Sequence, residues 1–217
     1  MTVALSASVL CFGDSNTHGQ RPGAPGRFPA DVRWPGVLQK ELGPGTRVIE
    51  EGLSGRTTLV DDPAEPYCNG RDYLIPCLWS HGPLAAVVMG LGTNDLKVHL
   101  GLTPRQVAAN AEALVQAVLC SGSGLDGAPP LLVLLPPPPI GPLQGPLSEQ
   151  FYGAGERARE LVVLFRTVAT DAGCAFLDTH AHSEVGEDGL HLSARGHAAL
   201  GRAVADTLRR LLQAQLP

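Results

Sequence analysis

Residues 8–16 read SVLCFGDSN, a short apolar run that ends at a glycine and is followed at once by polar side chains. An apolar run of this length predicts a strand buried on both faces, as in a parallel sheet. Similar runs recur along the chain, separated by stretches with helical spacing. They predict strands at 47–51, 85–91, 131–135 and 174–177, and helices at 31–42, from 104 onwards, at 151–172 and at 193–212.

The alternation of strands and helices decides the fold class. It predicts an α/β protein with a parallel sheet of about five strands covered by helices on both faces, a three-layer α/β/α sandwich. At 217 residues the chain fits a single domain, residues 1–217, with no internal repeat and no linker.

Composition narrows the function classes. The chain is 44% hydrophobic and 17% charged, as an ordinary globular protein is, and its formal net charge of −5 argues against nucleic acid as a partner. No stretch approaches the ~18 apolar residues of a membrane span, and residues 1–10 lack a basic targeting region, so we expect a cytoplasmic protein without membrane contact. The five scattered cysteines predict reduced, mostly buried thiols rather than disulfides or a zinc site.

Polar, glycine-bearing segments follow three predicted strands, and a fourth precedes the last helix. They are Gly13-Asp14-Ser15-Asn16, Gly52-Leu53-Ser54-Gly55-Arg56-Thr57, Gly92-Thr93-Asn94-Asp95 and Asp188-Gly189-Leu190-His191. Parallel α/β sheets place their ligand site beyond the carboxyl ends of the strands, so we expect these segments to meet there. The Gly/Pro-rich loop 19–30 and the proline-rich loop 136–146 are expected to wall the same site.

Together these segments contain the groups that acyl transfer needs. A serine hydroxyl becomes a nucleophile when an imidazole takes its proton, and His191 is the candidate base for Ser15. Asp188, three residues earlier, can hold one ring nitrogen of His191 and so fix its tautomer. The backbone amides of Ser15 and Gly55 and the side-chain amide of Asn94 are candidate donors to an oxyanion.

Other polar and aromatic residues receive less specific predictions. Asp14 is expected to hold the Ser15 turn, and Ser54 to hydrogen-bond within the loop that presents the Gly55 amide. Arg56 is expected either to brace the loops of the site by pairing with a carboxylate or to lie at the surface. The pair His180 and His182 is assigned to a solvated loop rather than a metal site, and His197 to packing, whereas His81 and His99 show no carboxylate partner at readable spacing. Packing is expected of four aromatic residues, Trp34, Trp79, Tyr67 and Tyr73. For Trp34 the alternative is that it lines the pocket or a subunit contact.

The four polar segments resemble blocks I, II, III and V of the SGNH (GDSL-type) hydrolases. Further stretches resemble the bacterial arylesterase/acyltransferase branch of that family, namely 32–34, 36–38, 48–54, 56–58, 61–63 and 91–95 together with Lys97. The resemblance implies a flavodoxin-like strand order, a triad of Ser15, His191 and Asp188, and an oxyanion hole made by Ser15, Gly55 and Asn94. It implies hydrolysis of short-chain, acetyl-type esters, acyl transfer to alcohols or peroxide, and compact homo-oligomers, often octamers.

Two positions depart from the family pattern. The motif GDSL, after which the family is named, has leucine at the position of Asn16, and relatives carry a bulky aromatic residue at the position of His18. Both residues are therefore assigned to substrate binding. The expected partner is a small-molecule ester, and no metal or organic cofactor is implied. Two alternatives use the same triad, a carbohydrate acetylesterase and a lysophospholipase. A non-catalytic binding protein of the same fold is disfavoured because every catalytic position is filled.

Overall fold

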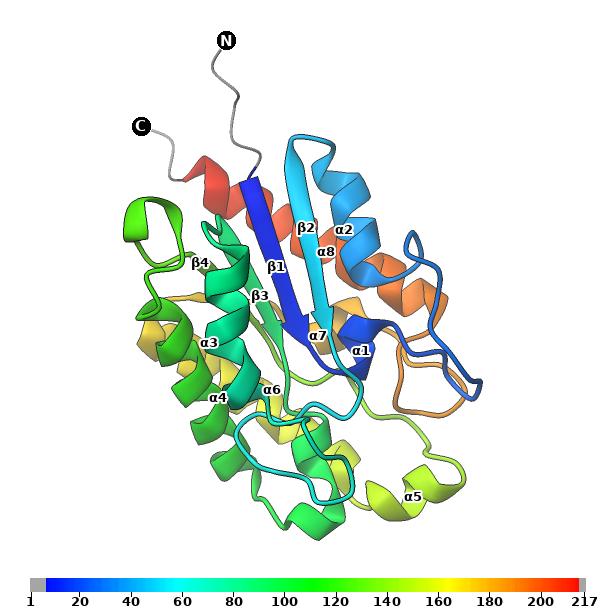
Figure 1. Cartoon of the computed structure of the whole chain (residues 1–217). Coiled ribbons are helices and arrows are strands. Elements are labelled where there is room, and N and C mark those ends of the chain that lie inside the picture. The colour runs from blue at the N-terminus through cyan, green and yellow to red at the C-terminus, as the bar shows by residue number, and fades with distance from the viewer. Residues whose placement is uncertain (1–6, 215–217) are drawn as a thin grey trace.

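The structure, a computed structural model, describes residues 7–214. Its centre is one five-stranded parallel sheet in the order β2-β1-β3-β4-β5 (Figure 1). The strands are β1 (Ala7–Gly13), β2 (Thr46–Gly52), β3 (Ala86–Gly90), β4 (Leu131–Leu135) and β5 (Ala175–Phe176). All five predicted strands are therefore present, in the predicted parallel arrangement, although β5 is shorter than expected.

Helices cover both faces of the sheet, which confirms the three-layer α/β/α architecture. The α-helices are α1 (Ser15–His18), α2 (Trp34–Leu42), α3 (Gly70–His81), α4 (Pro104–Leu119), α5 (Pro146–Gln150), α6 (Ala154–Ala172), α7 (Thr179–His182) and α8 (Ala194–Gln213). Three short 3₁₀ turns are η1 (Asn94–Leu96), η2 (Val98–Leu100) and η3 (Leu125–Gly127). Figure 1 shows α2 and α8 together on one side of the sheet and α3, α4 and α6 on the other.

The apolar side chains of strand β1 pack into two hydrophobic cores, one on each face of the sheet. Leu10 and Phe12 belong to the core under α3, α4 and α6, whereas Val9 and Cys11 belong to the core under α2 and α8. All four side chains have no exposed surface. Because successive side chains of a strand point to opposite faces, a strand buried on both sides must be apolar throughout.

The carboxyl ends of three neighbouring strands are aligned at a row of glycines. Gly13 of β1 is in register with Gly52 of β2 and with Gly90 of β3. A Cβ atom on Gly13 would overlap the Thr17 side chain and the Gly90 carbonyl, so the polar segment after β1 can fold closely over the sheet edge only from a glycine. This row positions the functional segments.

Two helix boundaries differ from the predictions. The carbonyl of Pro29 accepts hydrogen bonds from the amides of Val32 and Arg33, so a turn occupies this stretch and α2 begins at Trp34 rather than at Asp31. The helix expected from residue 151 begins only at Ala154, because Gly153 has a left-handed backbone (φ 70°) that separates α6 from α5.

Helix α3 was not predicted. It contains Pro76 in its interior, which normally argues against a helix, and large apolar side chains lie on its exposed side as well as its buried side. Trp79, on the exposed side, is 68% exposed, so the helical period of the buried residues is obscured. None of the helices within residues 7–214 is long and apolar enough to span a membrane. The prediction that no targeting region precedes β1 concerns residues 1–6, which lie outside the described residues.

Candidate active site

Ser15 lies at the start of α1, directly beyond the carboxyl end of β1. Asp14 caps this helix, because its carboxylate accepts a hydrogen bond from the Asn16 amide at 2.9 Å. Such a cap satisfies one of the amides that the first helical turn leaves without a partner. The expected role of Asp14 in holding the Ser15 turn is thus confirmed, and the Ser15 side chain lies at the base of a cleft, only 5% exposed.

The loop before α8 brings a histidine and an aspartate to this serine. His191 Nε2 lies 3.1 Å from Ser15 Oγ, and His191 Nδ1 lies 2.7 Å from Asp188 Oδ2. The two ends of the chain that meet here are separated by 176 positions. A hydroxyl, an imidazole and a carboxylate are thereby connected in one line of hydrogen bonds.

Asp188 is fixed by its own loop as well as by His191. Its Oδ1 accepts hydrogen bonds from the amides of Leu190 and His191, each at 2.9 Å, and Oδ2 also accepts one from the Gly23 amide at 3.3 Å. Burial alone would raise the pKa of Asp188, but the hydrogen bonds from the His191 side chain and from the two amides outweigh it and lower the pKa to about 2. The carboxylate is therefore ionised at every pH at which the protein would work.

The loop after β2 presents Gly55 beside Ser15. The side chain of Arg56 fixes this loop to the ends of β1 and β2. The Arg56 guanidinium is buried, donates hydrogen bonds to the carbonyls of Gly13 (2.9 Å) and Glu51, and stacks 4.3 Å from the centre of the Phe12 ring. Arg56 therefore braces the loops, as one of its two predictions proposed, but it does so through backbone carbonyls rather than through a carboxylate.

The loop after β3 is tied to the Gly55 loop by two adjacent side chains. Asn94 Nδ2 donates to the Arg56 carbonyl at 3.0 Å, and the buried Asp95 carboxylate accepts hydrogen bonds from the amide and the hydroxyl of Thr58. Burial raises the pKa of Asp95 to about 6, although the Thr58 hydrogen bonds act in the opposite direction. Asn94 thus lies next to Gly55, with one of its two amide hydrogens engaged by the loop.

Two clefts are lined in part by His191. The smaller has a volume of about 130 Å³ and is lined by Ser15, Gly55 and Asn94 on one side and by Leu147, Phe151 and Leu190 on another. The larger has a volume of about 520 Å³. It is lined from the two predicted wall loops by Gln20, Arg21, Gly23, Ala24, Gln144, Gly145 and Pro146, and from elsewhere by Leu147, Glu187, Asp188 and His191.

Comparison with known proteins identifies this arrangement. A sequence profile of the GDSL-like Lipase/Acylhydrolase family matches residues 11–199. The chain belongs to this family. The native M. smegmatis aryl esterase is 40% identical and superposes with a TM-score of 0.90 over 94% of this chain and 99% of that one. Est24, a carbohydrate acetylesterase from Sinorhizobium meliloti, is also 40% identical, with a TM-score of 0.89 over the same shares. No curated protein sequence matched the chain.

This GDSL-type hydrolase is therefore a carboxylic ester hydrolase, as the resemblance of its four polar segments predicted. A second structure described as a carbohydrate acetylesterase family member from Sinorhizobium meliloti is 34% identical, with a TM-score of 0.89 over 95% of this chain and 99% of that one. The names of these proteins divide between aryl esters and acetylated carbohydrates, and both groups share the hydrolysis of a carboxylic ester.

Asn16 and His18 line neither of the two clefts in this GDSL-type hydrolase. The Asn16 side chain accepts a hydrogen bond from the Leu192 amide at 2.9 Å and donates one to the Leu190 carbonyl at 3.5 Å, so it links the Ser15 turn to the His191 loop. His18 lies against the end of β2, where a Cβ atom on Gly52 would overlap its backbone. The substrate-binding role predicted for both residues finds no support in this geometry.

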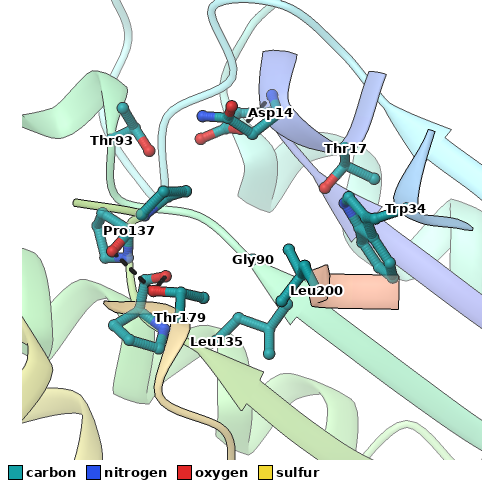
Figure 2. A pocket seen from close by; sticks show the side chains of 12 residues that line it. Asp14, Thr17, Trp34, Gly90, Thr93, Leu135, Pro137, Thr179 and Leu200 are labelled. Carbon is teal, nitrogen blue, oxygen red and sulfur yellow. Dashed lines mark hydrogen bonds between the residues drawn. The ribbon is translucent and has the colours of Figure 1, made fainter. Parts of the chain in front are cut away.

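A small pocket of about 20 Å³ lies beneath the Ser15 turn (Figure 2). Trp34, only 1% exposed, lines this pocket together with Asp14 and Thr93, so it packs inside the protein and does not reach the substrate clefts. Figure 2 also shows Thr179 beside Pro137; its hydroxyl donates to the carbonyls of Pro136 and Pro137 at 3.1 and 3.0 Å. These bonds anchor the proline-rich loop where it leaves the sheet.

The structure gives partners to two histidines that were left unassigned and moves two others. His81 and His99 pair with carboxylates far away in the sequence: their Nε2 atoms lie 2.8 Å from Glu51 and 2.9 Å from Asp62. His180 and His182 lie on the short helix α7 rather than in a loop. They belong to no cluster of metal-ligating side chains among residues 7–214.

The packing prediction holds for His197 and fails for two aromatic residues. His197 is fully buried, and its Nδ1 accepts a hydrogen bond from the Trp34 amide at 3.2 Å. Tyr67, by contrast, is 96% exposed and Trp79 is 68% exposed. The prediction for Ser54 is wrong in its partner: the hydroxyl donates at 2.9 Å to the Gln20 side chain in the loop 19–30, not to a group of its own loop.

Sequence reasoning assigned no site role to a buried ion-pair network beside the smaller cleft. Lys97 Nζ lies 2.8 Å from both Asp62 and Glu65, and the side chains of Lys97 and Asp62 are 1% and 0% exposed. Burial alone would raise the pKa of Asp62, but hydrogen bonds from Lys97 and His99 outweigh it and lower the pKa to about 2. Its partners lie more than thirty positions away in the sequence, so no local spacing could reveal them.

Replacing Lys97 with methionine should destabilise the protein by about 3–5 kcal/mol at pH 7, because the buried Asp62 carboxylate loses its cation. In the wild type Asp62 contributes stability that is present above about pH 4 and is lost as the pH falls to about 2. In the variant Asp62 can take up a proton at higher pH and relieve the penalty. Urea unfolding should therefore give a larger wild-type-to-variant difference at pH 7 than at pH 4.

Lys40→Met is the matched control, since Lys40 is an exposed lysine on α2. Its free energy of unfolding should stay within about 0.5 kcal/mol of the wild type. Equal effects of the two substitutions at pH 7 would contradict a structural role of the Lys97–Asp62 pair.

Proposed function

We propose that the protein is a serine esterase that hydrolyses short-chain carboxylic esters through a covalent acyl-enzyme. Ser15 Oγ attacks the ester carbonyl while His191 Nε2 takes its proton, and Asp188 holds the imidazole and stabilises its charged form. The amides of Ser15 and Gly55 and the side chain of Asn94 donate to the oxyanion of the tetrahedral intermediate. The observation that carries this proposal is the continuous line Ser15 Oγ–His191–Asp188, at 3.1 and 2.7 Å.

The second half of the reaction returns the enzyme to its starting state. His191 gives its proton to the leaving oxygen, the carbon–oxygen bond to the alcohol breaks, and the alcohol departs. A water molecule, or another alcohol, then loses a proton to His191 and attacks the acyl group, and Ser15 recovers its hydrogen when the intermediate collapses. Hydrolysis and acyl transfer differ only in which of these two nucleophiles arrives.

The two clefts support an assignment of the two halves of the ester. The smaller cleft contains the oxyanion donors, so the acyl group would occupy its 130 Å³. This volume suits a short acyl group, because a cavity of about 150 Å³ holds a molecule the size of benzene. The larger cleft lies at the His191 edge, where the leaving oxygen must be protonated, and would hold the alcohol.

The lining of the larger cleft favours an alcohol that forms several hydrogen bonds. Gln20, Arg21, Gln144 and Glu187 line it with polar residues, and no phenylalanine, tyrosine or tryptophan of the described chain lines it. A second candidate function is therefore removal of acetyl groups from a sugar or another polyol, with the same triad. Competition between an acetylated sugar and an aryl acetate in one reaction would rank the two alcohols directly.

A fluorophosphonate probe, which reacts only with activated serines, tests the proposal. We expect one probe molecule per chain by intact-mass measurement, with the modified peptide containing Ser15. Ser15→Ala should abolish labelling, because no other hydroxyl is within hydrogen-bond distance of His191 among residues 7–214.

Ser54→Ala is the matched control. Ser54 lines the same cleft, but its hydroxyl donates to Gln20 rather than to a base. This variant should still be labelled. Modification of Ser54, or no modification of a folded wild type, would refute the assignment of Ser15 as nucleophile, and the latter result would favour a binding protein of this fold.

A further inference from the structure

The Glu65 carboxylate lies directly against the glycine that is proposed to donate to the oxyanion. One oxygen, Oε1, lies 2.8 Å from Lys97 Nζ. The other, Oε2, fills the space beside Gly55 where a side chain would begin, since a Cβ atom on Gly55 would overlap it. Gly55 also has a left-handed backbone, with φ +82°, that other residues rarely adopt. The absence of a side chain at position 55 thus lets a carboxylate approach the oxyanion loop.

This carboxylate forms part of the wall of the smaller cleft. Glu65 and Lys97 line it, with Glu65 against Gly55, and the apolar side chains Phe151 and Leu190 line it as well. An acyl group bound to Ser15 with its oxygen toward Gly55 and Asn94 would have a carboxylate within reach of its first carbon atoms. The acyl end of the site is therefore not uniformly apolar.

The charges around Glu65 leave it with a spare acceptor. Lys97 is shared between the Glu65 and Asp62 carboxylates, so one cation faces two anions. No hydrogen bond to Glu65 Oε2 is formed by the residues that the structure describes, 7–214. A ligand that donates a hydrogen bond to an acceptor of this kind binds with a more favourable free energy. A ligand whose apolar group displaces water from the acceptor binds with a less favourable one.

We propose that Glu65 is a specificity-determining residue for the acyl group, and that it favours short acyl groups with a hydroxyl next to the carbonyl over alkyl groups of equal size. The hydroxyl of such a 2-hydroxyacyl group donates to Glu65 Oε2, whereas a methyl group in its place leaves the carboxylate without a partner. This inference rests on the proposed function, because it takes Ser15 as the residue that carries the acyl group.

Ethyl glycolate and ethyl propionate make a suitable pair of substrates, because they differ only by a hydroxyl in place of a methyl group. The measured quantity is the ratio of their kcat/KM values, followed by pH-stat. Comparing this ratio between enzymes cancels the different intrinsic reactivity of the two esters. In Glu65→Gln the ratio should fall about tenfold, because a hydrogen bond to a charged acceptor becomes one to a neutral acceptor.

Two further variants make the result decisive. Glu65→Ala removes the acceptor altogether and should lower the ratio at least as far, while Lys97 keeps its contact with Asp62. Glu160→Gln makes the same change of charge on the exposed side of α6 and should keep the wild-type ratio. The effect should appear chiefly in the glycolate reaction, with the propionate constants moving in the opposite direction or not at all.

The outcomes separate this inference from the function on which it rests. If the ratio is unchanged in both Glu65 variants, the specificity role of Glu65 is overturned. If Ser15→Ala is inactive in the same assay, the esterase mechanism is still upheld. If Ser15→Ala hydrolysed both esters at the wild-type rate, the proposed function itself would fail. A ratio that fell equally in Glu160→Gln would show a general effect of charge and would also overturn the role of Glu65.

Discussion

Ser15→Ala is expected to hydrolyse p-nitrophenyl acetate at least about 10³-fold more slowly than the wild type. The substitution removes only the hydroxyl oxygen, which lies 3.1 Å from His191 Nε2, and the turn around it is held by groups that stay in place. Asp14 still caps α1 through the Asn16 amide, so the variant should fold normally. The measurement is kcat/KM after subtraction of the uncatalysed rate, with circular dichroism to verify the fold.

Residual activity of the Ser15→Ala variant is as informative as its loss. The oxyanion donors and the substrate clefts remain, and such groups alone can accelerate the reaction modestly over water. Equal activity of the variant and the wild type would show that Ser15 is not the nucleophile. If both proteins were folded and inactive, a binding function would be favoured.

Asp188→Asn is expected to lower kcat by about 10⁴-fold with little change in the fold. An amide oxygen can still accept from the backbone amides of Leu190 and His191, as Asp188 Oδ1 does. The amide nitrogen, however, would face His191 Nδ1 and donate to it, which places the ring hydrogen on Nε2. An Nε2 that carries hydrogen cannot take the proton of Ser15.

The pH dependence of this variant provides a second test. The pKa of Asp188 is about 2, so the wild-type carboxylate is ionised from about pH 4 upwards. The difference in rate between the two enzymes should therefore persist from pH 5 to pH 8. Asp206→Asn, an exposed aspartate on α8, is the control and should behave as the wild type. A difference that vanished within this range would contradict the orienting role of Asp188.

Much of the fold was predictable because its central strands are buried on both faces. Continuous apolar runs such as Val9–Phe12 have few interpretations in a chain that alternates strands and helices. The polar segments after these runs had to meet at one sheet edge, and the row of Gly13, Gly52 and Gly90 shows why they meet closely. The convergence of Ser15, His191 and Asp188 was thus predicted from topology together with residue type.

Features that depend on tertiary packing were not predictable in the same way. In helix α3 the exposed Trp79 obscures the helical period of the buried residues. Its Nε1 donates to the Ser121 carbonyl at 3.1 Å although the ring is mostly exposed. The carboxylate partners of His81 and His99 lie on other loops and strands, and no local pattern indicates them. Asn16 was assigned to substrate binding because it departs from the leucine of the family pattern, and no local signal indicates that its side-chain oxygen accepts from the distant Leu192 amide and so joins two loops.

The separation of Ser15 from His191 by 176 positions also has a consequence for the protein while it is being made. A ribosome that adds roughly 5–20 residues per second needs about 9–35 s to travel from the serine codon to the histidine codon. Throughout that time the nascent chain carries an unactivated hydroxyl, without a base and without Asp188. By the proposed mechanism, hydrolytic activity therefore arises only after His191 has been made, late in translation.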